Sequence, residues 1–185
     1  MKILVLSHTR CGSTTLCKWI SKELNYILDE TPYERKHFNE VFEKDNIIRK
    51  IVVEEYFPTK EEINKFDKVI FLSRKNTIDA AISHISANNL QEWHIEYEVT
   101  NEWITENMVK IINISNYINN LKMKLNEYIG FHITYENIYE NKNSIGKILE
   151  YLNIVNPKHL ECLNYGNRYR KDNNVLIKDK PTKLI

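Results

Sequence analysis

Short runs rich in hydrophobic residues predict the strands of this chain. They fall at 3–6, 47–53, 68–73 and 131–135, and Arg49 and Lys50 interrupt the second run. Runs of this length, rich in Ile, Leu and Val, are typical of strands that are buried on both faces of a sheet. We therefore expect a central parallel sheet of four to five strands.

Segments with hydrophobic residues at helical spacing lie between and after these runs. They predict helices over 13–24, through 80–82, over 108–125 and over 145–152. Thr59 with Glu62 forms a capping-box pattern, which predicts a short helix over 60–66. The segment 26–34 has the Pro and small polar residues of a loop, and a further short helix is expected near 35–45.

The order of strands and helices favours a doubly wound α/β sheet. In such sheets the crossovers are right-handed, and ligands bind beyond the carboxyl ends of the strands. The turn after the first strand and the segment that begins at Arg74 both follow such ends. We expect them to face one crevice.

Composition and charge narrow the class of protein. The 185 residues are most simply one domain over 1–185, with a basic tail over about 164–185. A net charge of +1 argues against a general nucleic-acid binder. The three Cys indicate neither a disulfide framework nor a zinc site. No leader or membrane-spanning pattern is found, so a soluble, cytoplasmic protein is expected.

The turn after the first strand has the chemistry of an anion site. Ser13, Thr14 and Thr15 are expected to cap the following helix, whose N–H groups and positive dipole end point at one place. A Walker A loop is excluded, because the segment has one glycine, Gly12, and its cation, Arg10, precedes that glycine. No Arg closes the turn as it would in a cysteine phosphatase. An unrelated strand–turn–helix stays an alternative.

The run Arg10-Cys11-Gly12-Ser13-Thr14-Thr15 resembles the 5′-phosphosulfate loop of the sulfotransferases, P-[KR]-S-G-[ST]-[ST]. Thr9 stands where that family has Pro, and Cys11 where it often has Ser. The resemblance implies that residues 10–15 bind the 5′ end of 3′-phosphoadenosine 5′-phosphosulfate (PAPS). It also implies that Arg10 stabilises the negative charge that develops on the leaving phosphate.

Residues 68–84 resemble the family's 3′-phosphate segment, in which a strand ends in Arg and a Ser follows about two helical turns later. Such a pair would hold the 3′-phosphate through charge-assisted hydrogen bonds. Here Lys75, not Arg74, has the usual separation from Ser83. Either Arg74 or Lys75 is therefore expected to make the contact. The alternative is that the Arg at the strand end is an ordinary surface residue that binds no phosphate.

Residues 133–140 resemble a third family block, Y-E-[DN]-L, and the helix after it ends in the expected L-x-[IV] pattern at 152–154. We expect Tyr135 and Glu136 to be structural, because a buried Glu at this place would accept hydrogen bonds from backbone donors.

The three blocks together imply a small PAPS-dependent sulfotransferase with a three-layer α/β/α fold like that of P-loop NTPases. Such an enzyme moves a sulfuryl group from PAPS to a hydroxyl or amine by in-line displacement, releases adenosine 3′,5′-bisphosphate (PAP), and needs no metal. The acceptor (carbohydrate, small molecule or protein side chain) is not identified. A nucleotide-binding protein or nucleotide kinase relative without sulfotransferase activity is the alternative.

The general base has three candidates. Glu30 comes first, because its acidic, Pro-containing loop resembles one found in small bacterial members of the family. Glu55, at the end of the second strand, lies where other members carry a catalytic His, and His8 is third. Cys11 stands near a helix N-terminus, where a thiol pKa can fall, but has no obvious partner base.

Overall fold

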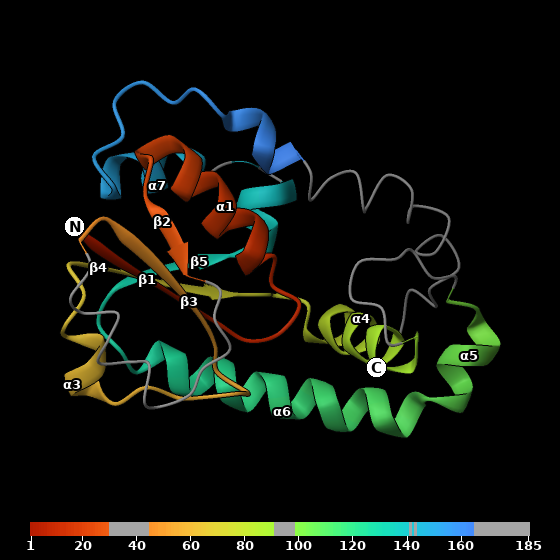
Figure 1. Cartoon of the computed structure of the whole chain (residues 1–185). Helices are drawn as coiled ribbons and strands as arrows, with labels where there is room; N and C mark the ends of the chain where they lie inside the picture. The colour runs from red at the N-terminus through yellow and green to blue at the C-terminus, as the bar shows by residue number, and fades with distance from the viewer. Residues whose placement is uncertain (30–44, 91–98, 141, 143, 165–185) are drawn as a thin grey trace.

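The computed structural model describes residues 1–29, 45–90, 99–140, 142 and 144–164 (Figure 1). Their elements in chain order are β1 (Lys2–Ser7), α1 (Ser13–Leu24), β2 (Ile27–Asp29), β3 (Ile47–Val52), α3 (Lys60–Ile63), β4 (Lys68–Ser73), α4 (Thr77–Leu90), α5 (Asn101–Glu106), α6 (Met108–Asn126), β5 (Phe131–Thr134), a π-helical turn (Glu136–Glu140), α7 (Ile145–Tyr151) and a 3₁₀ turn (Leu160–Asn164). The expected α/β order is confirmed.

The described strands form one sheet of five, in the order β2-β3-β1-β4-β5, and every neighbouring pair is parallel. The central strand is β1, and its run Ile3 to Leu6 is fully buried. Because all strands run the same way, Ser7, Val52, Ser73 and Thr134 end at one edge of the sheet. The loops that follow them meet there.

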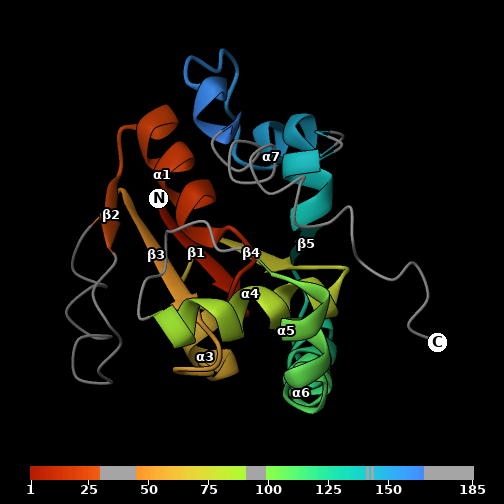
Figure 2. The ribbon, with the colours of Figure 1, turned by 90° about the vertical axis from the view of Figure 1, so that its right-hand side faces the viewer.

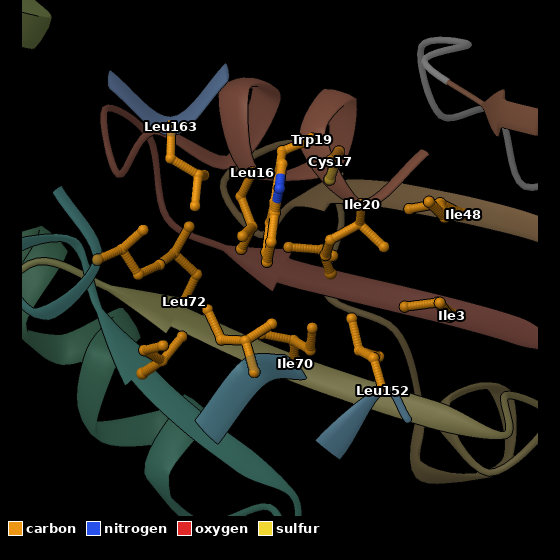
Figure 3. Close-up of a cluster of buried hydrophobic side chains, with 14 of the residues drawn as sticks. Ile3, Leu16, Cys17, Trp19, Ile20, Ile48, Ile70, Leu72, Leu152 and Leu163 are labelled. Atoms are coloured by element: carbon orange, nitrogen blue, oxygen red, sulfur yellow. The ribbon is translucent and has the colours of Figure 1, made fainter. Parts of the chain in front are cut away.

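Alternate side chains of the strands face two different helical layers. On one face Ile3, Val5 and Ile70 pack against α1 and α7, with Trp19 fully buried between helix and sheet (Figure 3). On the other face Leu4 and Leu6 belong to a cluster that includes side chains of α3 and α6. The result is the predicted three-layer α/β/α arrangement (Figure 1).

A third hydrophobic cluster joins α4, α5 and α6. Its members are Ala80, Ala81, Ile82, Ile85, Val99, Ile104, Ile111 and Ile118. Packing on α6 fixes the position of α4, which follows the carboxyl end of β4 (Figure 2). The polar residues of α4 can therefore face the loop after β1.

The interrupted second run is a regular strand, because each of its charged side chains has a partner. Arg49 on β3 stands opposite Asp29 on β2 and forms an ion pair with it, although the Arg49 side chain is almost fully buried. The prediction of a loop over 26–34 is thus wrong for Ile27–Asp29, which form the edge strand β2. Three residues are too short for a periodic signal, and the cross-strand ion pair is invisible in the local sequence.

The predicted helices mostly agree with the structure. At α3 the capping box is present in full, with Thr59 and Glu62 bonded to each other's backbone N–H groups, but the helix ends at Ile63 rather than at 66. The helix expected near 35–45 lies outside the described residues except for Asp45, and so does the basic tail beyond 164. None of the helices in the described ranges is long and apolar enough to cross a membrane.

Candidate active site

The loop between β1 and α1 contains two residues in the left-handed region. Arg10 has φ 61° and Gly12 has φ 76°. Gly12 is the N-cap of α1, and no side chain caps the helix there, so the expected capping by Ser13, Thr14 or Thr15 is wrong. Glycine adopts this conformation without strain but has no side chain to offer. The positive end of α1 therefore keeps its attraction for an anion.

Helix α4 binds this loop through two consecutive residues. Nε of Arg10 donates a hydrogen bond to Oγ of Ser83 over 2.8 Å. Oγ1 of the preceding Thr9 lies 3.4 Å from Nδ1 of His84. The structure thus brings together two of the segments that the sequence singled out, although they are 73 residues apart.

The orientation of His84 follows from its second contact. Its Nε2 lies 3.0 Å from the amide nitrogen of Asn88 one turn later. That amide donates, so Nε2 accepts, and the ring hydrogen is on Nδ1, toward Thr9. Burial lowers the pKa of His84, and the nearby Arg10 charge lowers it further. A neutral imidazole beside the loop is the result.

A second cation reaches the start of α1 from the neighbouring strand. Nζ of Lys50 on β3 lies 3.0 Å from Oγ1 of Thr14 and donates a hydrogen bond to it. This contact was not predicted from the sequence, in which Lys50 only interrupts a hydrophobic run. One signal was available in the sequence. Lys50 stands two residues after Ile48, so its side chain is expected on the same face of the sheet, the face that packs on α1.

Glu54, which follows β3, also contacts the loop after β1. Its Oε1 accepts a hydrogen bond from the Thr9 backbone N–H over 2.8 Å. Its Oε2 is shielded from solvent and has no hydrogen-bond partner among the described residues. Burial raises the pKa of this carboxyl, although the Thr9 hydrogen bond acts the other way. Sequence reasoning missed Glu54 as well.

Two of the three sequence-based candidates for the base are glutamates. Glu55 is exposed to solvent, directly beside the partly buried Glu54. Glu30 lies outside the described residues. Their catalytic roles stay predictions.

Arg74 is held by acidic and aromatic side chains at the end of β4. Its guanidinium lies 4.0 Å from Glu136 and 3.9 Å from Asp79, and it stands over the Tyr135 ring at 4.7 Å from the centroid. Only 9% of Arg74 is exposed. Ser83, its expected companion, is bonded to Arg10 instead. The role of Arg74 toward a 3′-phosphate therefore stays a prediction.

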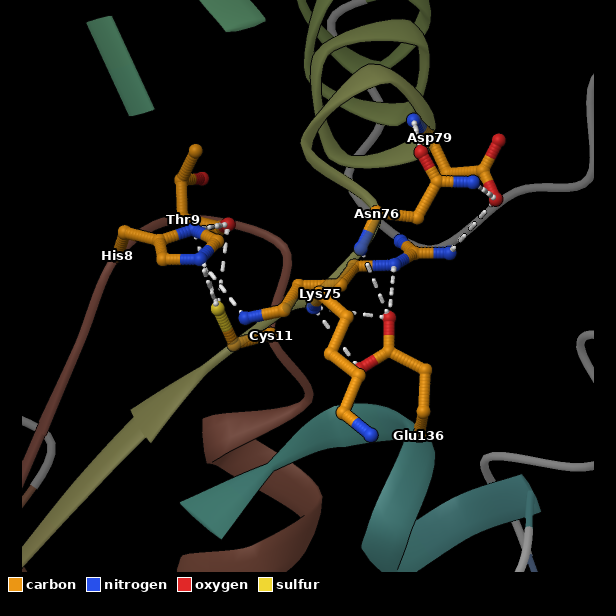
Figure 4. A network of polar contacts seen from close by, with 8 residues as sticks. His8, Thr9, Cys11, Lys75, Asn76, Asp79 and Glu136 are labelled. Carbon is orange, nitrogen blue, oxygen red and sulfur yellow. Dashed lines mark hydrogen bonds and ion pairs between the residues drawn. The ribbon is translucent and has the colours of Figure 1, made fainter. Parts of the chain in front are cut away.

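Glu136 organises the turn between β4 and α4, as Figure 4 shows. It accepts hydrogen bonds from the backbone N–H groups of Lys75 and Asn76 at 2.9–3.2 Å, so its expected structural role is confirmed. Burial raises the pKa of Glu136, but these bonds and the Arg74 charge bring it below its ordinary value. The Lys75 side chain is exposed, and its Nζ lies 3.4 Å from Oδ1 of Asn137.

His8 connects the first loop to the end of β4. Its Nδ1 lies 2.8 Å from the Thr9 carbonyl, and its Nε2 accepts a hydrogen bond from the Arg74 backbone N–H over 3.0 Å. Burial is the largest effect on its pKa, which is lowered to about 4. The ring is therefore neutral, and both nitrogens have partners within the protein. This arrangement favours a structural role.

The Cys11 side chain lies against the His8 ring, with Sγ 3.1 Å from both ring nitrogens (Figure 4). Cys11 is fully buried, and burial raises the pKa of its thiol well above the ordinary value. A buried thiol with a raised pKa is inert as a nucleophile. Cys11 can contribute to an anion site through its backbone.

The remaining predicted residues lie in the first turn of α1. Ser13 is buried, whereas Thr14 and Thr15 are partly exposed beside the loop. In the part of the chain that the structure describes, no group of three or more His, Cys, Asp or Glu side chains could hold a metal ion. Around the loop after β1, the described residues thus bring together the start of α1, the cations Arg10 and Lys50, and the partly buried Glu54 carboxyl.

No protein-family model matches the chain, and neither does any curated protein. Solved structures do resemble it. One is the YorR protein of Bacillus subtilis in complex with phosphorylated GDP, with a TM-score of 0.43 and 16% identity, covering 82% of this chain and 95% of that one. The sulfotransferase domain from the curacin biosynthetic pathway has a TM-score of 0.47 and 14% identity, covering 85% and 75%.

A third resembling structure is deoxyadenosine kinase from M. mycoides with bound dCTP, with a TM-score of 0.42 and 18% identity, covering 84% of this chain and 100% of that one. At TM-scores below 0.5 and identities below 20%, these likenesses assign neither a family nor an activity to this chain.

Proposed function

We propose that the chain is a sulfotransferase that moves a sulfuryl group from PAPS to a hydroxyl or amine of an acceptor. One observation carries the proposal: the hydrogen bond from Arg10 to Ser83. It joins the segment that resembles a 5′-phosphosulfate loop to the segment that resembles a 3′-phosphate site. A donor that carries phosphate groups on both sides of its ribose needs these two segments side by side.

The 5′ end of the donor suits the start of α1. Its phosphate would accept hydrogen bonds from the backbone of residues 11–15, from the hydroxyls of Ser13, Thr14 and Thr15, and from Arg10 and Lys50. During in-line displacement, negative charge builds on the oxygen that leaves sulfur. Arg10 and the helix N-terminus, fixed in advance, would stabilise that charge.

The 3′-phosphate would lie against α4. Ser83 accepts a hydrogen bond from Arg10, so its hydroxyl lies where it would contact both Arg10 and the phosphate. Lys75 offers an exposed cation beside this position, and Arg74 offers a buried one held by Glu136. We therefore assign PAP as the product that this surface would retain.

A nucleotide kinase relative is the second candidate, and Lys50 favours it. A cation at the start of the first helix is what binding of a transferred phosphoryl group requires, and Lys50 lies there beside Thr14. The two candidates differ in the nucleotide that they prefer.

The nucleotide preference is measurable by thermal unfolding. At equal concentrations, PAP should raise the melting temperature more than ADP, AMP or ATP. If the Kd for PAP is tenfold lower than that for ADP, PAP stabilises the protein by about 1.4 kcal/mol more at saturation. This corresponds to a melting temperature roughly 3–5 °C higher for a domain of this size.

Variants on one helix sharpen this test. Ser83→Ala should reduce the advantage of PAP over ADP, whereas Ser86→Ala, a buried serine on the same helix, should preserve it. Equal shifts for all four nucleotides would remove the basis of the proposal. A larger shift with ATP would favour the kinase relative.

A further inference from the structure

We propose that Glu54 is the general base of this site, the group that takes the proton from the acceptor's hydroxyl or amine. The inference rests on the proposed function and names a residue that the sequence did not single out.

The Glu54 carboxylate lies beside the loop that would bind the donor. Glu54 follows β3 at the carboxyl edge of the sheet, and its Oε1 is fixed by the Thr9 backbone N–H at 2.8 Å. Thr9 is the neighbour of Arg10, which is proposed to hold the reacting end of the donor. The loop that would bind the donor therefore also orients the carboxylate.

The second oxygen of the Glu54 carboxylate is buried. Oε2 of Glu54 is withdrawn from water and accepts no hydrogen bond from the described residues. Leaving a buried acceptor without a donor is unfavourable, and such groups in native proteins call for an explanation. The hydroxyl or amine that receives the sulfuryl group would donate the missing hydrogen bond to Oε2. Its proton would then be placed for transfer to Glu54.

The surrounding charges agree with this role. Burial raises the pKa of Glu54, and the neighbouring Glu55 raises it further. Among the described residues, the buried Cys11 thiol is close enough for the Glu54 charge to raise its pKa, and the neutral His84 of α4 contacts the same Thr9 that binds Glu54. A carboxylate with a raised pKa is a stronger base than an exposed one. Glu55, by contrast, is exposed to solvent.

In the transfer step, one bond to sulfur forms as another breaks. The acceptor oxygen or nitrogen forms a bond to sulfur while the bond from sulfur to the 5′-phosphate oxygen breaks. The electron pair of that bond stays on the phosphate of PAP. Glu54 receives the acceptor's proton on Oε2 and releases it to solvent after product leaves.

The test compares Glu54→Gln with wild type, using PAPS labelled in its sulfuryl sulfur and a mixture of 2-naphthol, glucosamine and tyrosine ethyl ester as acceptors. The amide oxygen of Gln can still accept from Thr9, so the thermal shift with PAP should stay unchanged. Transfer should fall by about 10²–10⁴-fold. In wild type the rate should rise with pH through the raised pKa of Glu54, and this rise should vanish in the variant.

Three further variants identify the carboxylate that matters. Glu55→Gln and Glu30→Gln test the rival assignments. Glu150→Gln is the control. It removes one exposed carboxylate on α7, far from Glu54 in the sequence, and should leave the rate unchanged. If Glu54→Gln does not fold, Glu54→Asp, which keeps the charge on a shorter stem, should fold and retain part of the rate and its pH dependence.

Several results would overturn the inference. Transfer at the wild-type rate by Glu54→Gln would do so, and loss of PAP binding by that variant would reduce Glu54 to a support of the loop. A wild type that binds PAP but labels none of the three acceptors would remove the base role and leave the donor site standing. A wild type that does not bind PAP would instead contradict the proposed function itself.

Discussion

Arg10→Ala should weaken the binding of PAPS and PAP by about 10- to 150-fold and should also slow sulfuryl transfer. The guanidinium is proposed to contact the phosphate in the ground state and the charge that grows during reaction. Loss of one charge-assisted hydrogen bond costs about 1.5–3 kcal/mol. Isothermal titration with PAP and transfer from labelled PAPS measure the two effects separately.

The control for Arg10→Ala is a change that removes one positive charge elsewhere. Lys124 is exposed at the end of α6, which leads into the amino end of β5, on the opposite edge of the sheet from the loop. Lys124→Ala should leave PAP binding unchanged. Arg10→Lys should be intermediate, because it keeps the charge but loses the planar fork. Wild-type binding and rate in Arg10→Ala would mean that the loop is merely a turn.

Gly12→Ala should destabilise the protein by about 2–5 kcal/mol, because two costs add. The residue has φ 76°, where a Cβ costs about 1–2 kcal/mol. The new Cβ would also lie 2.7 Å from Cε2 of Tyr139, and overpacking of this kind costs about 1–3 kcal/mol. Tyr139 cannot withdraw freely, since it is buried and its hydroxyl donates to the Gly12 carbonyl at 2.7 Å. Urea unfolding measures the change.

A second glycine provides the matched comparison. Gly146 lies in α7, and a Cβ there would meet nothing within 4 Å. Gly146→Ala should be neutral or stabilise the helix by up to about 1 kcal/mol. A Gly12→Ala variant as stable as wild type would show that the loop is free to rearrange, which contradicts the fixed geometry on which the site depends.

The sheet and most helices could be predicted because their signals are local. The apolar run of β1 indicates by itself that the strand is buried. The helical spacing of Leu16, Trp19 and Ile20 likewise indicates the buried face of α1. The edge strand β2 could not be predicted, because its three residues depend on an ion pair with Arg49 across the sheet.

The candidate site was predictable only in part, and for the same reason. Arg10 and Ser83 stand in motifs, so the sequence could single them out, yet their bond to each other appears only in the fold. Neither Lys50 nor Glu54 stands in a motif, although Lys50 shares the register of Ile48 on the α1 side of the sheet. Their roles depend on β3 lying next to β1, which brings them to Thr14 and Thr9. The sequence pointed first to Glu30 and second to Glu55, which is one residue away from the carboxylate that faces the loop.

The central claim, transfer of a sulfuryl group, is tested by offering two labelled donors to the wild-type protein in parallel. One is PAPS labelled in its sulfuryl sulfur, and the other is ATP labelled in its γ-phosphate. Both are incubated with one mixture of phenols, amino sugars, nucleosides and nucleoside monophosphates. The account predicts that the sulfur label appears in an acceptor while the phosphorus label stays in ATP. Movement of the phosphorus label instead, or of neither label, would contradict it.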